Sequence, residues 1–152
     1  MFRAVMISMI SAAALAFSLP ATAQKGEGTA AEAKAMLEKV VAAIKADPAK
    51  TIAQINKGEG GFKDRDLYPV CSGPDGKIVA NPDTSRIGMQ RADLKDASGK
   101  AYGAEMLKVA EEGKFAEVSY MFPRPGADKT PVAKVSFVTK VAGNVCIVGY
   151  YK

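Results

Sequence analysis

The chain has no histidine, no tryptophan and only two cysteines among its 152 residues. Histidine is the usual proton-transfer group at neutral pH, and no serine stands in a Gly-x-Ser-x-Gly turn, so the common catalytic dyads and triads are missing. Two cysteines are too few soft ligands for a zinc site, and the glycines form no phosphate-binding loop. We therefore expect no enzyme, no metal and no cofactor. A Schiff-base role for Lys134 would require a buried amine with a lowered pKa.

The sequence also lacks runs of positive charge. Its 21 lysine and arginine residues and 16 aspartate and glutamate residues give a formal net charge of +5, and the basic residues are scattered along the chain. Nucleic-acid binding calls for a basic stripe interleaved with aromatic side chains. We therefore expect no nucleic-acid partner.

The first 23 residues have the pattern of a secretion signal. Arg3 is followed by an uncharged run from Ala4 to Leu19, and Ala21 and Ala23 occupy the −3 and −1 positions of a signal-peptidase site. The run is short for a membrane span, and polar residues follow it. We expect cleavage after Ala23, a single domain over 24–152 and a periplasmic or secreted location with no membrane span after cleavage. An uncleaved membrane anchor is the alternative.

Cys71 and Cys146 each lie in a short apolar run that predicts a strand. In an oxidising compartment two such cysteines are expected to form a disulfide. Closing a loop of about 75 residues would stabilise the fold by roughly 4 to 5 kcal/mol on the chain-entropy model. The alternative is a pair of buried free thiols.

Helical periodicity dominates the N-terminal third of the exported part. A capping box begins at Thr29, and apolar residues then recur on one face, which predicts a helix over 30–46. Asp47 caps a second helical segment, which the glycines within 58–61 end. A further helix is predicted over 101–112.

The remaining apolar runs predict strands. Two runs on either side of the turn at 73–76 predict a hairpin, followed by a long loop over 83–99 with one helical turn. Three later runs, at 115–122, 132–141 and 144–151, predict an antiparallel meander. Alternation in the second of these puts one set of side chains against a helix and the other toward solvent or a pocket. The first set is Val135, Phe137, Thr139 and Val141, and the second is Lys134, Ser136, Val138 and Lys140.

Several short motifs occur in a distinctive order. They are Asp64-Arg65-Asp66-Leu67-Tyr68, Gly76-Lys77, Gly88 with 93–100, Phe122-Pro123-x-Pro125, Lys134 to Val138, and Val148 to Lys152. Together they resemble the single Cache domain, an extracytoplasmic sensor module related to PAS folds, over roughly residues 29–152. The resemblance implies an α+β fold with a five-stranded antiparallel sheet of order 2-1-5-4-3. A long N-terminal helix would cover one face and a helix-loop segment the other, and the two cysteines would lie on adjacent strands.

The resemblance also implies a pocket between the sheet and the arching segment, suited to a small carboxylate or similar metabolite. The residues that match its positions are Tyr120, Phe122, Lys134, Ser136, Met89 and Arg91. A cation, a hydroxyl and an aromatic wall are what a partly desolvated carboxylate requires. Simpler interpretations remain open: Lys134 as a solvated strand residue, the two aromatic residues as core packing, and the arginines as surface partners of aspartates.

We therefore expect an exported sensor module that binds a small organic acid and acts in trans on a membrane receptor or an exported partner protein, in signal transduction or chemotaxis. The alternative is a Cache domain that has lost its ligand and has a structural or protein-interaction role. The first strand, Pro69 to Gly73, and Asn81 in place of the family's histidine favour the alternative. Tyr120, Lys134 and Ser136 favour the sensor.

Overall fold

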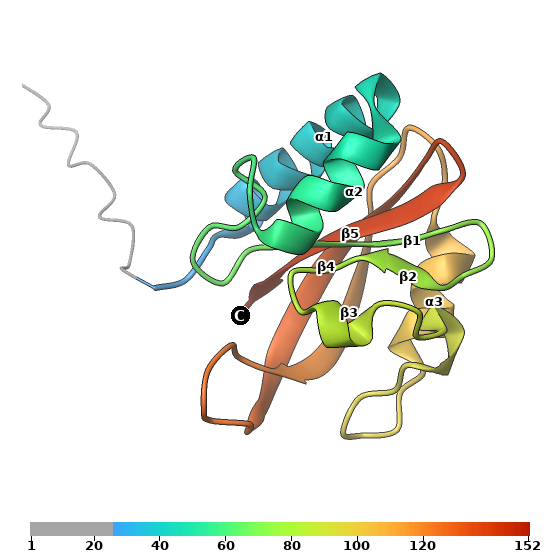
Figure 1. Cartoon of the computed structure of the whole chain (residues 1–152). Helices are drawn as coiled ribbons and strands as arrows, with labels where there is room; N and C mark the ends of the chain where they lie inside the picture. Colours follow the sequence, from blue (N-terminus) through green and yellow to red (C-terminus); the bar gives the residue numbers. More distant parts are fainter. Residues whose placement is uncertain (1–25) are drawn as a thin grey trace, which may run out of the picture.

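The structure, a computed structural model, describes residues 26–152 (Figure 1). The predicted signal peptide lies outside these residues, so its cleavage after Ala23 remains a prediction. No helix within 26–152 is both long enough and apolar enough to cross a bilayer.

Two helices form the N-terminal part of the described chain. α1 spans Ala30–Ala46 and begins with the predicted capping box at Thr29. α2 spans Pro48–Lys57, with Asp47 as its N-cap. It ends at Gly58, whose φ of 67° lies in the left-handed region that glycine adopts without strain. The cap and proline signals therefore predicted both helix starts.

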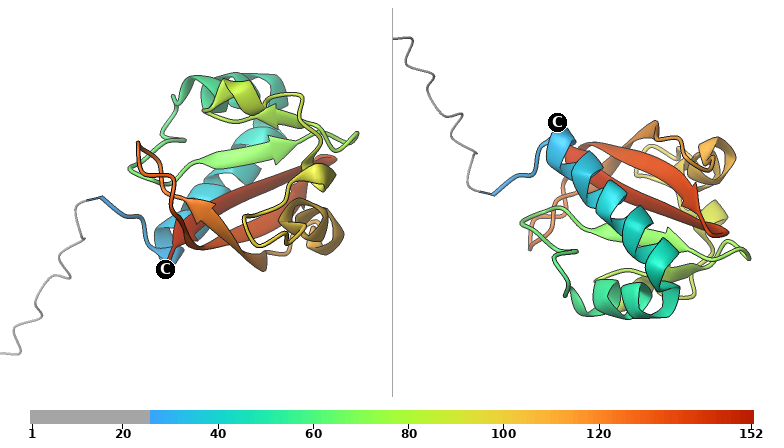
Figure 2. Two further views of the ribbon diagram at one scale, coloured as in Figure 1. Left: turned by 90° about the horizontal axis from the view of Figure 1, so that it is seen from below. Right: turned by 90° about the horizontal axis from the view of Figure 1, so that it is seen from above.

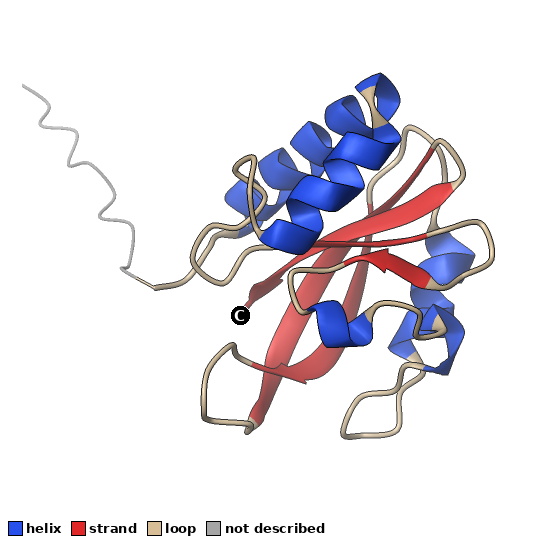
Figure 3. Cartoon of the chain, viewed as in Figure 1, coloured by secondary structure: helices blue, strands red, loops and turns tan. Residues whose placement is uncertain are grey.

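The five strands form one antiparallel sheet in the order β2-β1-β5-β4-β3, as predicted (Figure 3). Their bounds are β1 Pro69–Ser72, β2 Ile78–Ala80, β3 Ala116–Pro123, β4 Pro131–Val141 and β5 Asn144–Tyr151. The last strand is thus the middle one, and it pairs with both halves of the sheet. Cys71 of β1 lies opposite Cys146 of β5, and the two are joined by the predicted disulfide.

The sheet separates two hydrophobic cores. α1 packs on one face against residues that include Phe137 and Val141 of β4. The opposite face holds a smaller core with Val138 of β4 and Met106 of α3, the helix at Tyr102–Val109. In Figure 2, α1 and α3 lie on opposite sides of the sheet. The alternation predicted for β4 is therefore confirmed.

The segment between β2 and β3 differs in detail from the prediction. It contains two 3₁₀ turns, η1 (Thr84–Arg86) and η2 (Arg91–Asp93), where one turn was expected. α3 ends at Val109, earlier than predicted, because the following backbone becomes extended and the Glu111 carbonyl accepts a hydrogen bond from Lys140 N at 3.2 Å. Pairing with β4 thus replaces the last helical turn.

Candidate functional site

A cavity of about 430 Å³ lies between the sheet and the segment that arches from β2 to α3. β3, β4 and β5 supply its floor, η1 and η2 contribute two arginines, and the β3–β4 loop forms part of its mouth. Its volume falls within the range of about 300 to 1,000 Å³ that is typical of small-molecule sites. The cavity is therefore the candidate site for a ligand.

Lys134 of β4 is buried in this cavity, with only 4% of its surface exposed. Its Nζ lies 3.3 Å from the Tyr151 hydroxyl, and it is 4.5 Å, 4.8 Å and 5.2 Å from the ring centroids of Tyr151, Tyr68 and Phe122. Within the described residues no carboxylate lies within ion-pair distance of it. The aromatic rings stabilise the ammonium group, but they do not neutralise it.

Desolvation lowers the pKa of Lys134 to about 8, and the charge of Asp66 partly opposes this effect. Burial and a lowered pKa are the two conditions that a Schiff-base role requires. At pH 7, however, an amine with this pKa is still roughly nine-tenths protonated. The protonated form is a donor for an anion and not a nucleophile, so the site favours ionic binding at neutral pH.

Arg91 is a second buried cation, with 1% of its surface exposed. Its Nε donates to the Ser72 hydroxyl, its Nη2 to the Val70 carbonyl at 3.2 Å, and its Nη1 lies 3.6 Å from the Met106 sulfur. Burial lowers its pKa to about 10, so the guanidinium remains charged at neutral pH. The alternative of a surface ion pair with Asp93 is therefore wrong for Arg91. Its neutral partners fix its position and leave its charge unbalanced.

Two hydroxyl groups lie on the cavity floor beside Lys134. The Tyr120 and Ser136 oxygens are 2.9 Å apart, and the Tyr120 ring stacks on Tyr102 with centroids 4.3 Å apart. Burial raises the pKa of Tyr120, so its hydroxyl stays protonated. Gly149 of β5 makes room here, because a Cβ at this position would lie 2.5 Å from the Lys134 Cε and 2.6 Å from the Ser136 Oγ.

Five of the six residues predicted for the site line the cavity: Tyr120, Phe122, Lys134, Ser136 and Arg91. Met89, the sixth, lies outside it and is 43% exposed. Its backbone carbonyl accepts from Ile78 N at 2.9 Å, which ties Met89 to the edge strand β2, away from the floor. The expectation that Met89 lines the pocket is therefore wrong.

The prediction missed several other residues around the Lys134 amine and the cavity. Three are aromatic: Tyr68, Tyr102 and Tyr151. The fourth is Gly149, whose lack of a side chain leaves room for Lys134 and Ser136. They come from three separate segments of the chain, ahead of β1, in α3 and in β5, so no local pattern connects them. The only local features of the sequence that pointed to the site were the hydroxyl side chains and the alternation along β4.

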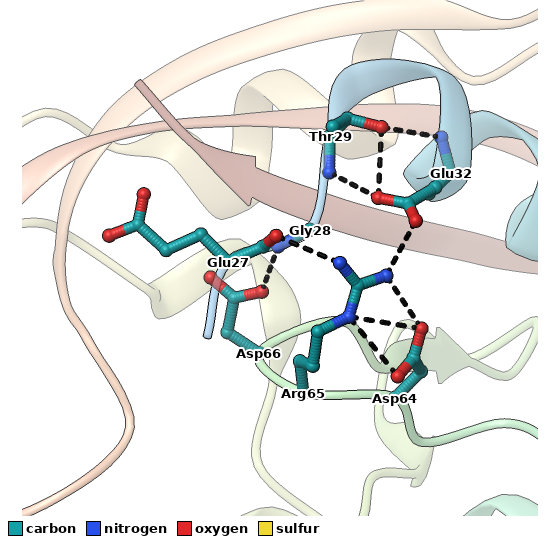
Figure 4. A network of polar contacts seen from close by, with 7 residues as sticks. All are labelled: Glu27, Gly28, Thr29, Glu32, Asp64, Arg65 and Asp66. Carbon is teal, nitrogen blue, oxygen red and sulfur yellow. Dashed lines mark hydrogen bonds and ion pairs between the residues drawn. The ribbon is translucent and has the colours of Figure 1, made fainter. Parts of the chain in front are cut away.

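Two rim residues tie the cavity to the N-terminal segment of the domain. Arg65, held at φ 54°, bonds to Glu32 and Asp64 at 2.7 Å and to the Glu27 carbonyl at 2.9 Å (Figure 4). Arg124 of the β3–β4 loop pairs with the Glu27 carboxylate at 2.8 Å. The charges of these two arginines are therefore largely balanced, unlike those of the buried cations.

The cavity wall is strongly positive as a whole. It contains seven cationic side chains and one carboxylate, that of Asp83. The cationic residues are Lys63, Arg65, Arg86, Arg91, Arg124, Lys129 and Lys134. Charges of one sign in a concave, low-dielectric site focus the field and attract counter-ions. Chemically, the arrangement can bind an anion.

Comparison with known proteins identifies the family to which this fold belongs. The family model "Single Cache domain 2" matches residues 8–151, so the chain belongs to this family, as the sequence motifs predicted. Members of this family are sensor domains and are generally not enzymes. No curated protein matches the chain.

Solved structures with the same fold include a methyl-accepting chemotaxis protein from Vibrio parahaemolyticus, with 20% identity and a TM-score of 0.63 over 80% of this chain and 86% of that one. A periplasmic sensor domain of a chemotaxis protein has 21% identity and a TM-score of 0.58, with 78% and 86% of the chains covered. A Cache chemosensory domain studied for carboxylic acid recognition has 21% identity and a TM-score of 0.57, with 78% and 84% covered. These likenesses confirm the predicted fold.

Proposed function

We propose that this protein is an exported sensor domain that binds a small organic acid in the cavity and signals its presence to a partner protein. The observation that carries the proposal is the pair of deeply buried cations, Arg91 and Lys134, which have no carboxylate partner within residues 26–152. A buried charge without a partner is costly, so an anion bound beside it recovers much of that cost. The carboxylic acid bound by a structural relative supports the same ligand class.

The floor of the cavity suits a carboxylate. The ammonium group of Lys134 supplies a charge-assisted hydrogen bond, and the hydroxyls of Tyr120 and Ser136 supply neutral donors next to it. Arg91 contributes its positive field from the cavity wall, because its three side-chain nitrogens already have protein partners. The aromatic rings of Tyr68 and Phe122 offer an apolar wall for the carbon chain of the acid.

The location is also part of the proposal. The secretion signal in the first 23 residues would deliver the domain over 24–152 to the periplasm or the medium. The Cys71–Cys146 disulfide is consistent with an oxidising compartment. Once exported, the domain would act in trans on a membrane receptor or another exported protein.

The test is a thermal-shift and calorimetric screen of the oxidised protein over 24–152 against short mono- and dicarboxylic acids. A ligand at about 100 times its dissociation constant adds about 2.7 kcal/mol to the free energy of unfolding. Lys134→Met should abolish binding, whereas Lys140→Met, an exposed site on the same strand, should retain it. Failure of every acid to bind the wild type would reject acid sensing and favour a ligand-free interaction domain.

A further inference from the structure

A third cationic side chain, besides the buried Arg91 and Lys134, lines the cavity. Arg86 of η1 lies at the mouth, with its guanidinium carbon 5.3 Å above the centroid of the Phe122 ring. The Nζ of Lys134 lies 5.2 Å from the same centroid. Two positive groups therefore lie close to one aromatic ring, Lys134 on the cavity floor and Arg86 at its mouth.

Arg86 is poorly neutralised. Its ion pair with Asp83 is long, at 3.5 Å, and the Asp83 carboxylate is 60% exposed. That carboxylate already accepts hydrogen bonds from the hydroxyl and backbone N of Ser85, at 2.6 Å and 3.2 Å. An exposed ion pair of this kind contributes little, and the hydroxyl of Tyr102, a second polar neighbour, is neutral, so Arg86 keeps its charge for a ligand.

The distances limit what can bridge the two cations. Because both groups lie within 5.3 Å of one centroid, they are no more than about 10.5 Å apart. Each cation needs about 3 Å to its carboxylate oxygen. No more than about 4.5 Å then remains between the two carboxylate oxygens. Since each carbon–carbon bond is about 1.5 Å, this span admits a chain of four carbons, or of five in a bent conformation, and excludes longer extended chains. A cavity of about 430 Å³ is also far larger than a one- or two-carbon acid requires.

We propose that the ligand is a dicarboxylate of four or five carbons, with one carboxylate at Lys134 and Ser136 and the other at Arg86. This inference rests on the proposed function and narrows its ligand class. The aromatic ring of Phe122, which lies close to both cations, packs against the central carbons of the ligand. Arg86 is thus the residue that distinguishes diacids from monoacids.

The experiment compares matched acids by titration calorimetry on the oxidised protein over 24–152. Succinate is paired with butyrate, and glutarate with pentanoate. The two acids of each pair have the same number of carbons and differ in one terminal carboxylate. The wild type should bind each diacid at least about tenfold more tightly than its monoacid, as expected for one additional charge-assisted contact.

Two variants test which residue causes the difference in affinity between diacids and monoacids. Arg86→Gln should weaken diacid binding by about tenfold and monoacid binding by less than about twofold. Lys140→Gln, which removes one exposed charge elsewhere on β4, controls for the change in net charge. Circular dichroism of each variant checks that the fold is intact.

Two results would overturn the inference. If a monoacid binds as tightly as its diacid, or if Arg86→Gln weakens both equally, the dicarboxylate assignment fails while acid binding stands. If none of the four acids binds the wild type, the dicarboxylate assignment fails, and a wider screen of acids decides the proposed function separately.

Discussion

Replacing Lys134 by methionine should stabilise the ligand-free protein. Methionine matches the length of the lysine stem and needs no solvation, whereas Lys134 places an unpaired ammonium in a cavity where 4% of the residue is exposed. Its pKa falls from 10.5 to about 8. That difference corresponds to about 3 kcal/mol against the charged form, of which the surrounding rings return about 1 to 2 kcal/mol.

The expected gain is therefore about 1 to 3 kcal/mol at pH 7, or roughly 4 to 12 °C in the unfolding midpoint of a domain of this size. The gain should depend on pH in a defined direction. Between pH 8 and 10.5 the folded wild type has lost a proton that the unfolded chain retains, so its stability rises with pH relative to the variant. The difference between the two proteins should be constant below pH 8 and should shrink above it.

The assay is urea denaturation of both oxidised proteins, followed by circular dichroism from pH 6 to 10.5. Other titrating groups are common to the two proteins, so the difference isolates Lys134. Lys140→Met, at an exposed position of the same strand, should change stability by less than about 0.5 kcal/mol. A destabilised Lys134→Met protein, or a difference that does not change with pH, would show that Lys134 is not held as an uncompensated charge.

Further predictions concern single features of the scaffold. Gly149→Ala should displace the Lys134 and Ser136 side chains and weaken acid binding with little loss of fold, since the clash falls on side-chain and not backbone atoms; calorimetry and circular dichroism would separate the two effects. Replacing Cys71 and Cys146 by alanine should lower stability by up to roughly 4 to 5 kcal/mol on the chain-entropy model, measured by urea denaturation; an unchanged midpoint would contradict this. Thr29→Ala should cost about 1 kcal/mol through the lost cap of α1, and a thermal melt with no shift would count against the capping box.

The sequence predicted the parts of this fold that depend on local patterns. The capping box at Thr29, the cap at Asp47 and the alternation along β4 each depend on residues within one turn or one strand. The length of α3 could not be predicted in the same way, because it ends where Glu111 pairs with Lys140, 29 positions further along the chain. Long-range pairing overrode a helical pattern there.

The same division applies to the candidate site. Lys134 and Ser136 were identified because they match the family and share one face of a strand, and Arg91 because it matches the family alone. Its burial contradicts the ordinary expectation for an arginine and arises from partners on β1 and α3. Gly149 gave no signal at all, since only its approach to Lys134 explains why a side chain is missing there.

The position of β5 has a consequence for how an exported chain would assemble. A chain that crosses a membrane from its N-terminus delivers Cys71 first and Cys146 75 residues later. Until β5 arrives, β1 with β2 and β3 with β4 are separate hairpins with nothing between them. The floor of the cavity, the disulfide and the central strand would then all be completed in the one step in which β5 is added, so a chain translocated only as far as β4 could not bind ligand.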